Sequence, residues 1–597
     1  MTFAPKFKTL VEIYRHSAKT FPERPLFGVK QGATWQWMTY REFSERVDAM
    51  RAALEQLGIG PGSRVAVIAN NRVEWAVAAY ATYGRGAAFV PMYEAQHDSD
   101  WIHILGDCQA ELVFTANETI RDRIRGIQKQ LPALANLVVF DGCGDAGSLS
   151  YDELIDRGRG KHSPLIDPDP EDIAGFIYTS GTTGMPKGVL LRHRNFAYNV
   201  SGIHAIFPLT PDDRSLSFLP WAHSFGQVIE LHTLFSLGAS MGIAESVPQI
   251  IPNLAEVKPT MLVAVPRIFN RIYDGLHKKM AQESPLKRRL FAAAMATAGE
   301  RKTLASRGES NTWTDLKFKL LDRLVGSKVR ARFGGQLKYA ISGGAAISRA
   351  VAEFIDDLGI QVYEGYGLTE TSPIATANAP GHRKIGSVGR ALPGTHIEID
   401  IAATNDPEQG EIIVHGHNVM KGYNGLPAED SKVFTADGGL RTGDMGRLDD
   451  DGFLYITGRI KEQYKLENGK YVVPSPIEEL LKLSPFISNV MLYGSNRPFN
   501  VALVVPDREA VLAWAKTEGL TLGDYDGLLR DAKVHALIEA ELTERSKDVR
   551  HYERARKFYL LSEDFTVENE MLTPSLKLKR RVVLKAYGDR IDGLYGG

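Results

Sequence analysis

The strongest signal in the sequence is the stretch Tyr178-Thr-Ser-Gly-Thr-Thr-Gly-Met-Pro-Lys-Gly188, which follows an apolar run that predicts a buried strand ending in a loop. Glycines let the backbone approach a bulky anion, hydroxyl side chains donate hydrogen bonds to phosphate oxygens, and a lysine adds positive charge. The spacing differs from that of a Walker A loop, and a glycine-rich surface turn is the alternative interpretation. We favour a phosphate-binding loop, and its predicted contact residues are Thr179, Ser180, Gly181, Thr182, Thr183, Gly184 and Lys187.

Strand and helix patterns alternate on both sides of this loop. Upstream, an apolar run at 64–69 is followed by a helical pattern at 71–83 and by a second apolar run at 87–92. Such alternation is typical of a parallel sheet covered by helices. Further strands are expected at residues 110–114, 173–178, 214–219, 239–244, 260–265, 337–342 and 361–363.

Two segments depart from this alternation. Residues 267–330 are charged and helical in pattern, which predicts a helical insertion, and residues 395–458 contain short alternating runs typical of a β-rich subdomain. The predicted fold class is therefore α/β. We expect a large N-terminal domain of layered, parallel-rich sheets with helices, residues 1–458, and a small, mobile α+β C-terminal domain, residues 459–597.

The composition excludes several classes of protein. Lysine plus arginine number 71 and aspartate plus glutamate 72, so the formal net charge is −1 and a dedicated nucleic-acid binder is not expected. The two cysteines, Cys108 and Cys143, are too few for a disulfide framework or a four-cysteine zinc site, and they fit a reducing compartment. The N-terminus lacks an apolar signal region, and no uninterrupted apolar stretch reaches the roughly 18 residues of a membrane span. We therefore expect a cytoplasmic enzyme.

Four further motifs follow the loop in order along the chain. They are Ser342-Gly-Gly-Ala-Ala346, Gly365-Tyr-Gly-Leu-Thr-Glu370, Arg441-Thr-Gly-Asp444 and Gly452-Phe-Leu-Tyr-Ile-Thr-Gly-Arg459. Together with the loop they resemble the signatures of the adenylate-forming superfamily, which includes acyl-CoA synthetases, peptide-synthetase adenylation domains and firefly luciferases. The resemblance covers nearly the whole chain and implies that these segments surround one molecule of ATP.

The resemblance also implies roles for individual residues. Thr369 would contact the phosphate and the acyl carboxylate, and Glu370 would hold Mg²⁺, a hard cation that prefers oxygen ligands. Asp444 would accept hydrogen bonds from the ribose hydroxyls, and Arg459 would reach ribose and phosphate. The residues expected to pack on the adenine or to lie opposite it are Gly343, Gly344, Ala345, Tyr366 and Gly367.

The C-terminal stretch Leu572-Thr-Pro-Ser-Leu-Lys-Leu-Lys-Arg-Arg581 resembles the segment that carries the catalytic lysine of the family. The pattern Ser-x-Lys assigns this role to Lys577. Many members have glycine where this chain has Leu576, and Lys579 is the rival assignment. Lys461 occupies the hinge position of the family, which implies rotation of the C-terminal domain between adenylation and thioester formation.

Residues 265–273, the helical insertion and residues 458–471 resemble long-chain fatty acyl-CoA synthetases in particular. His223 would lie near the substrate carboxylate; a histidine of the core is the alternative. Only a short loop, residues 371–385, follows the Thr-Glu motif, whereas fatty acyl-AMP ligases carry an insert there, and this favours CoA as the acceptor. The implied reaction converts a fatty acid, ATP and CoA to acyl-CoA, AMP and pyrophosphate. An acyl-AMP ligase, an acyl-carrier-protein-loading ligase and a medium-chain or aryl acid–CoA ligase are the alternatives.

Two other stretches need an interpretation. Residues 285–325 mix basic and apolar residues at helical spacing, which is compatible with an anionic membrane surface or, more commonly, with a helix packed on its own domain. Residues 142–147 match GxGxxG, but they do not open directly into a helix, so we predict a surface turn rather than a dinucleotide site.

Overall fold

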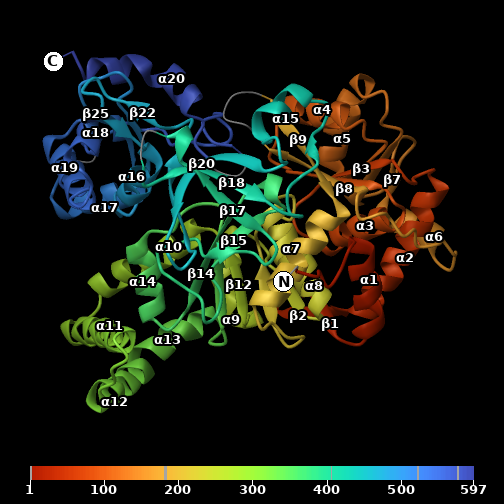
Figure 1. Cartoon of the computed structure of the whole chain (residues 1–597), viewed down its shortest axis with the longest axis horizontal. Helices are drawn as coiled ribbons and strands as arrows, with labels where there is room; N and C mark the ends of the chain where they lie inside the picture. Colours follow the sequence, from red (N-terminus) through yellow and green to blue (C-terminus); the bar gives the residue numbers. More distant parts are fainter. Residues whose placement is uncertain (1–2, 180–184, 405–406, 521–522, 574–576, 597) are drawn as a thin grey trace.

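The computed structural model describes residues 3–179, 185–404, 407–520, 523–573 and 577–596. In Figure 1 the larger, N-terminal part of the chain, from red to cyan, forms the body of the molecule, and the C-terminal residues, in blue, gather at one corner. Helices α11 (Pro285–Ser306) and α12 (Thr312–Leu321) project from another corner. The expected α/β architecture is confirmed, with a large N-terminal part and a small C-terminal part.

The largest sheet has eight strands in the order β19-β9-β8-β4-β3-β5-β6-β7. From β8 to β7 the neighbouring strands are parallel, as the strand–helix alternation predicts. The edge strands β9 and β19 are antiparallel, so the predicted phosphate-binding loop joins two neighbouring antiparallel strands, β8 and β9. The strands are β3 (Arg64–Ile68), β4 (Ala88–Met92), β5 (Leu112–Asn117), β6 (Asn136–Asp141), β7 (Leu149–Ser150), β8 (Ile173–Thr179), β9 (Lys187–Arg192) and β19 (Gly422–Tyr423).

Helices cover this sheet, and their apolar residues and capping residues account for their burial and their bounds. Helix α3 (Val73–Gly84) is apolar on every side, and nearly all of its residues are buried. The apolar spacing at 44–58 predicts a helix, and helix α2 (Tyr40–Gln56) begins four residues earlier. The reason is that Thr39 and Glu42 form a capping box, in which each side chain accepts a hydrogen bond from the backbone N–H of the other. The helix that the sequence predicts near residues 98–107 is α4 (Asp98–Asp107).

Two smaller sheets combine parallel and antiparallel strands. In one, β10, β11 and β1 are parallel and β2 is antiparallel; the hairpin β1–β2 was not predicted. In the other, β12, β13 and β14 are parallel, and β15 and β16 follow in antiparallel order. The strands are β1 (Pro25–Gln31), β2 (Thr34–Thr39), β10 (Arg214–Ser217), β11 (Ser240–Ile243), β12 (Met261–Ala264), β13 (Tyr339–Ser342), β14 (Val362–Gly367), β15 (Ile374–Ala377) and β16 (Arg390–Ala391).

The predicted insertion is helical between β12 and β13. It contains α10 (Pro266–Ala281), α11, α12, a π-helical turn (Asp322–Gly326) and α13 (Ser327–Arg330). The predicted β-rich subdomain is an antiparallel sheet in the order β17-β18-β20-β21. Its strands are β17 (His396–Asp400), β18 (Gly410–His415), β20 (Leu440–Leu448) and β21 (Leu454–Arg459).

The C-terminal part combines the sheet β24-β25-β26 with helices. The sequence pattern at 526–546 predicts one helix, but the structure divides this stretch into α18 and α19, because the Asp531 side chain accepts the Lys533 amide and begins a new helix. Two hydrophobic clusters of this part contain only residues beyond position 459. The domain boundary between residues 458 and 459 stays a prediction. The elements are α16 (Pro474–Leu481), β24 (Ile487–Tyr493), β25 (Asn500–Pro506), α17 (Arg508–Thr517), α18 (Tyr525–Leu529), α19 (Ala532–Arg545), β26 (Ala555–Leu560) and α20 (Arg580–Gly593).

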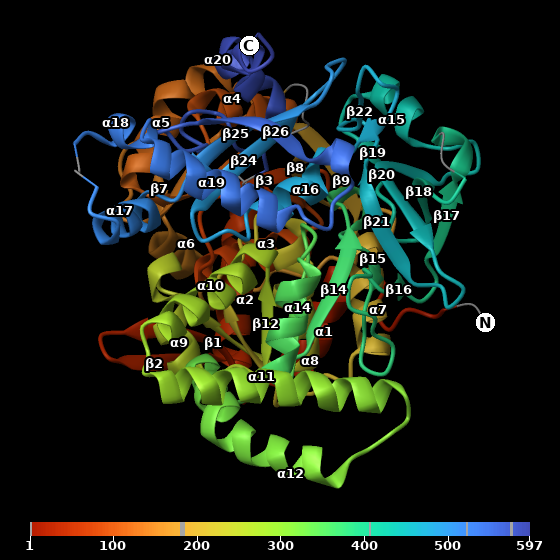
Figure 2. The same ribbon diagram turned by 90° about the vertical axis from the view of Figure 1, so that its left-hand side faces the viewer.

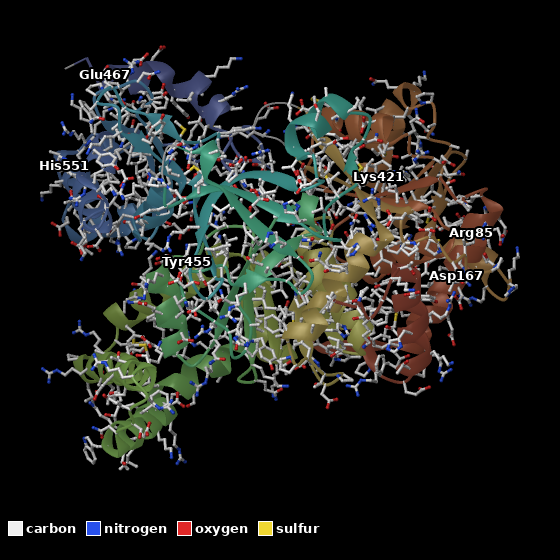
Figure 3. All side chains as sticks on the ribbon, in the orientation of Figure 1. Arg85, Asp167, Lys421, Tyr455, Glu467 and His551 are labelled. Atoms are coloured by element: carbon white, nitrogen blue, oxygen red, sulfur yellow. The ribbon has the colours of Figure 1, made fainter. Side chains whose placement is uncertain are left out.

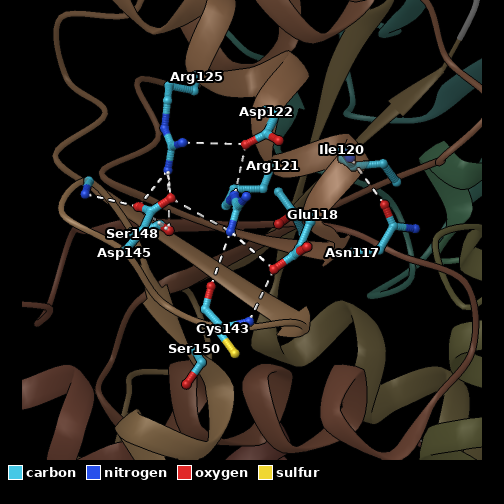
Figure 4. A network of polar contacts seen from close by, with 12 residues as sticks. Asn117, Glu118, Ile120, Arg121, Asp122, Arg125, Cys143, Asp145, Ser148 and Ser150 are labelled. Atoms are coloured by element: carbon cyan, nitrogen blue, oxygen red, sulfur yellow. Dashed lines mark hydrogen bonds and ion pairs between the residues drawn. The ribbon is translucent and has the colours of Figure 1, made fainter.

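The GxGxxG segment at 142–147 is a turn, as predicted. Figure 4 shows that the Arg125 guanidinium holds Asp145 at 2.7 Å, and Asp145 and Ser148 form an isolated β-bridge. Strand β7 then intervenes before helix α6 (Tyr151–Gly158), so the glycines do not lead into a helix N-terminus. In the described part of the chain, no helix combines the length and the apolar character that crossing a membrane requires.

Candidate functional site

Strands β20 and β21 place an acid and a base side by side. Asp444 and Arg459 are direct partners in this antiparallel pair, and Arg459 Nε lies 2.9 Å from Asp444 Oδ1. The Tyr366 hydroxyl, at the end of β14, donates to Asp444 Oδ2 at 2.8 Å. Burial raises the pKa of Asp444, although the Arg459 charge and the Tyr366 hydrogen bond act in the opposite direction. Residues from three separate motifs therefore meet at one carboxylate.

Glu370 lies beside the strands that flank the phosphate-binding loop. Its Oε1 accepts a 2.9 Å hydrogen bond from the Tyr423 hydroxyl, and its backbone carbonyl accepts the Met420 amide. Tyr423 belongs to β19, where it pairs with Val189 of β9. Because β9 directly follows the loop, Glu370 is brought to the side of the sheet from which the loop emerges.

Thr369 connects this region to the His223 segment. It is buried, and its hydroxyl lies 3.4 Å from the Ser224 hydroxyl. His223 Nδ1 accepts the Phe225 amide at 3.2 Å, which leaves Nε2 as the protonated nitrogen of the neutral ring. Desolvation lowers the pKa of His223 to about 4, with a smaller contribution from the charge of Lys577. The imidazole is therefore neutral near pH 7.

Lys577 brings the C-terminal part to the same site. The surrounding protein lowers the pKa of its ammonium group by desolvation, and Arg459 adds to this effect. Asp444 and Glu370 oppose it by favouring the charged form. The residue nevertheless keeps exposed surface. Lys577 is therefore close enough to interact electrostatically with Arg459, Asp444 and Glu370, which belong to three other motifs, and with His223.

Lys187, the first residue of β9, has an acidic partner in helix α15 (Pro427–Val433). Its Nζ lies 2.5 Å from Glu429 Oε2 and 5.2 Å from the centre of the Tyr423 ring. Hydrogen bonds from Lys187 and then Lys432 lower the pKa of Glu429 to about 2. Lys187 is thus held by a carboxylate that a phosphate anion can replace.

The segment expected to face adenine follows β13. A Cβ on Gly343 would lie 2.9 Å from the Phe225 ring, so only glycine fits there without a shift. Gly344 has a φ of +81°, and Gly344 and Ala345 are exposed. Glu364 Oε1 accepts the Ile347 amide at 3.1 Å and so ties this segment to β14.

Two other predicted glycine and loop positions can be placed. A Cβ on Gly367 would come 1.7 Å from the Pro373 carbonyl oxygen, which requires glycine at the end of β14. Thr179 ends β8 and pairs with Lys187 across the hairpin. The loop residues Ser180, Gly181, Thr182, Thr183 and Gly184 lie outside the described residues. Lys461 lies exposed just after β21, and its hinge role stays a prediction.

Tyr423 and Glu429 were not predicted from the sequence. Both lie in the segment that follows Lys421, a residue labelled in Figure 3. The Lys421 amide donates a hydrogen bond to the Leu190 carbonyl of β9. A tyrosine and a glutamate in such a segment carry no spacing signal, and only their position against β9 reveals contacts to Glu370 and Lys187. The contacts suggest positioning roles for both side chains.

The residues present fit a magnesium ion that arrives with ATP. Within the described residues no cluster of three or more histidine, cysteine, aspartate or glutamate residues is suited to hold a metal alone. Mg²⁺ at nucleotide sites commonly uses one or two carboxylates together with substrate phosphates, so it needs no such cluster. Glu370 supplies one carboxylate next to the strands that flank the loop.

Comparison with known proteins identifies the class. The profile of the AMP-binding enzyme family matches residues 14–424, and that of the AMP-binding enzyme C-terminal domain matches residues 461–597. The chain belongs to this family, the adenylate-forming enzymes. The adenylation domain of a carboxylate reductase from Mycobacterium chelonae has the same fold, with a TM-score of 0.81 at 23% identity over 100% of this chain and 92% of that one.

Curated relatives identify the branch. A long-chain-fatty-acid–CoA ligase, FadD15, of Mycobacterium bovis is 34% identical over 94% of this chain and 92% of its own length. Human long-chain-fatty-acid–CoA ligase 1 is 30% identical over 98% of this chain and 86% of its own length. Within the adenylate-forming enzymes, the chain belongs to the long-chain acyl-CoA synthetase branch. The family resemblance noted in the motifs is confirmed.

Proposed function

We propose that this protein is an AMP-forming long-chain fatty acid–CoA ligase. It converts a fatty acid, ATP and CoA to acyl-CoA, AMP and pyrophosphate. The observation that carries the proposal is the meeting of Glu370, Asp444, Arg459 and Lys577, which come from four separate motifs. Full-length similarity to long-chain-fatty-acid–CoA ligases supports the choice of substrate.

In the first step an oxygen of the fatty acid carboxylate attacks the α-phosphorus, and the bond to pyrophosphate breaks. Lys577 and Arg459 stabilise the negative charge that builds on the α-phosphate oxygens, and Thr369 donates a hydrogen bond there. Mg²⁺ held by Glu370 would neutralise charge on the phosphates. Asp444 accepts the ribose hydroxyls and so fixes the nucleotide. Neutral His223 adds no charge next to the substrate carboxylate but can donate a hydrogen bond from Nε2 to it.

In the second step the thiolate of CoA attacks the acyl carbonyl, and the bond between the acyl carbon and AMP breaks. The thiol proton leaves to solvent, and AMP departs with the electron pair. Because Lys577 serves the first step, CoA approaches after the C-terminal domain, residues 459–597, has rotated relative to residues 1–458 about Arg459–Lys461.

A panel of acids tests the proposal. Acids from acetate to long-chain fatty acids are incubated with ATP, with and without CoA, and pyrophosphate, AMP and acyl-CoA are measured. The proposal predicts acyl-CoA formation with long-chain acids and a strong requirement for CoA in AMP release. Acyl-AMP that accumulates unchanged in the presence of CoA would assign the alternative function, an acyl-AMP or carrier-protein-loading ligase. A preference for medium-chain or aryl acids would assign the other alternative.

We infer that the protein works in the cytoplasm, where ATP and CoA are available, with peripheral contact to membrane surfaces. Long-chain acids partition into lipid, so contact with a bilayer brings the enzyme to its substrate. The described part of the chain has no helix suited to cross a membrane, which agrees with a peripheral mode.

A further inference from the structure

Helix α12 carries an apolar face that packs on the protein. Thr314 and Leu321 are buried, and the Arg301 guanidinium lies over the Phe318 ring, with its carbon 4.8 Å from the centre of that ring. Arg301 belongs to α11 and also pairs with Asp315, so this face of α12 is turned toward α11. One apolar face is sufficient to anchor a surface helix.

A second apolar stripe on the same helix faces outward. Its members are spaced by three or four residues, so they follow one another along one side of the helix. Their exposed fractions are 72% for Trp313, 60% for Leu316 and 60% for Leu320, and Leu324 in the following turn is 43% exposed. Figure 2 shows α12 as the outermost layer of the molecule, beyond α11. Large apolar side chains in a continuous exposed stripe mark an interaction surface.

Basic residues flank this stripe. Because successive residues turn by roughly 100° around the axis, Lys317 lies on one side of the stripe and Lys319 on the other. Both are exposed, as is Arg323 in the next turn. The acidic residues of the segment are neutralised by partners, since Asp315 pairs with Arg301 at 2.8 Å and Asp322 with Arg330 at 2.7 Å. The surface around the stripe is therefore cationic.

We propose that the α12 stripe docks on the surface of a bilayer that contains anionic phospholipids. Trp313 and the leucines enter the boundary between headgroups and acyl chains, while Lys317, Lys319 and Arg323 reach the lipid phosphates. A second copy of this chain fits the stripe less well, because self-association would bring the same lysines together. The proposal rests on the peripheral membrane contact inferred above and assigns a surface to it; it is independent of the ligase reaction, since docking requires neither ATP nor CoA.

Vesicle co-sedimentation of the full-length protein tests this surface. The vesicles contain phosphatidylcholine alone or phosphatidylcholine with phosphatidylglycerol. Wild-type protein should bind the anionic vesicles, and Trp313→Ser/Leu316→Ser/Leu320→Ser should weaken this binding by about tenfold or more. Lys317→Glu/Lys319→Glu/Arg323→Glu should remove the preference for phosphatidylglycerol.

A matched control removes exposed apolar side chains elsewhere. Val247→Ser/Ile251→Ser/Ile401→Ser changes three residues that are 63%, 46% and 55% exposed, and it should bind vesicles as wild type does. Each variant is also assayed with a water-soluble acid, ATP and CoA. Unchanged activity there shows that the variant is folded and keeps the outcome separate from that of the proposed function.

Two results would overturn the proposal. The first is equal vesicle binding by the wild type and the α12 serine variant. The second is the absence of wild-type binding together with a concentration-dependent dimer, seen by sedimentation velocity, that the serine variant lacks. The second result would assign the stripe to another copy of the chain.

Discussion

Asp444 contacts both a cation and a hydroxyl, and this arrangement prepares it for a nucleotide. Arg459 and Tyr366 occupy its two oxygens at 2.9 and 2.8 Å. Ribose hydroxyls are donors of the same kind, so they can replace or share these contacts without leaving a buried carboxylate unpaired. Two sequence motifs predict that Asp444 and Arg459 both contact the nucleotide, and this stays a prediction; their direct contact with each other is a property of the β20–β21 register.

Lys577 is the residue whose removal we expect to separate the two half-reactions. Lys577→Ala should slow adenylation by about 100-fold or more, because the developing charge on the α-phosphate loses a cation. Thioester formation from supplied acyl-AMP should remain close to wild type. Fatty-acid-dependent ATP–pyrophosphate exchange reports the first step, and acyl-CoA formation from acyl-AMP reports the second.

Lys579→Ala is the matched control, since this lysine is the rival assignment two residues away. It should leave the exchange rate within a few-fold of wild type. A larger loss of exchange in Lys579→Ala than in Lys577→Ala would reverse the assignment, and an equal loss of both half-reactions in Lys577→Ala would contradict the two-pose scheme.

Tyr423 positions the carboxylate of Glu370. Tyr423→Phe removes the 2.9 Å hydrogen bond while keeping the ring that lies beside Lys187. We expect the Mg²⁺ concentration needed for half-maximal activity to rise by roughly tenfold, because loss of such an oriented partner weakens metal sites by this order. The measurement is ATP–pyrophosphate exchange against Mg²⁺ concentration.

Tyr455→Phe serves as the control, because its hydroxyl also donates to a carboxylate, Asp449, at 3.3 Å, but outside the site. It should leave the Mg²⁺ dependence unchanged. Equal curves for Tyr423→Phe and wild type would show that Tyr423 is only structural.

At the scale of elements, the turn after β21 is the proposed hinge. The Ile460 amide donates to the Gly443 carbonyl, so the start of this turn is tied to the large part of the molecule. Lys461→Pro should impair thioester formation more than adenylation, because proline fixes φ at a position that has to rotate. Lys461→Ala should leave both half-reactions near wild type. Equal impairment of both steps by Lys461→Pro would argue against a hinge at this residue.

Elements with strong periodicity could be predicted from the sequence. The buried parallel strands and the helices between them appear where the apolar runs predicted them, and the insertion at 267–330 is helical. The misses have two different causes, one long-range and one local. The hairpin β1–β2 gains its stability from pairing with β11, over 200 residues away, and the division between α18 and α19 depends on one capping side chain, Asp531.

The whole molecule contains buried neutral histidines that make its stability depend on pH. Burial lowers the pKa of His193 and of His232 to about 3, against 6.5 in the unfolded chain. Between these values the unfolded state binds more protons, so stability is lost as the pH falls below 6.5. At pH 5 each histidine costs about 2 kcal/mol relative to neutral pH.

Thermal unfolding at a fixed scan rate checks this expectation. The fall in Tm from pH 7 to pH 5 should be smaller in His232→Gln than in wild type, because one coupled protonation has been removed. His162→Gln, at an exposed position, should keep the wild-type fall. A wild-type Tm that does not change over this pH range would contradict the burial of neutral histidines.

The site itself is a long-range property of the molecule. Motif order predicted which segments meet, and the described residues Thr369, Glu370, Asp444, Arg459 and Lys577 do lie together. The partners Tyr423 and Glu429 could not be predicted, because their contacts arise from the antiparallel edge strands β9 and β19, which no local pattern indicates. The sequence therefore predicts the reactive residues of the site, but not the residues that support them.

The most direct measurement is a crystal structure with a non-hydrolysable analogue of a long-chain acyl-adenylate. We predict that its ribose hydroxyls contact Asp444, its phosphate analogue lies between Thr369 and Lys577, and its adenine lies between Gly344 and Tyr366. A nucleotide bound away from Asp444 and Lys577, or one that reaches only one of them, would contradict the claim that these distant motifs surround a single ATP.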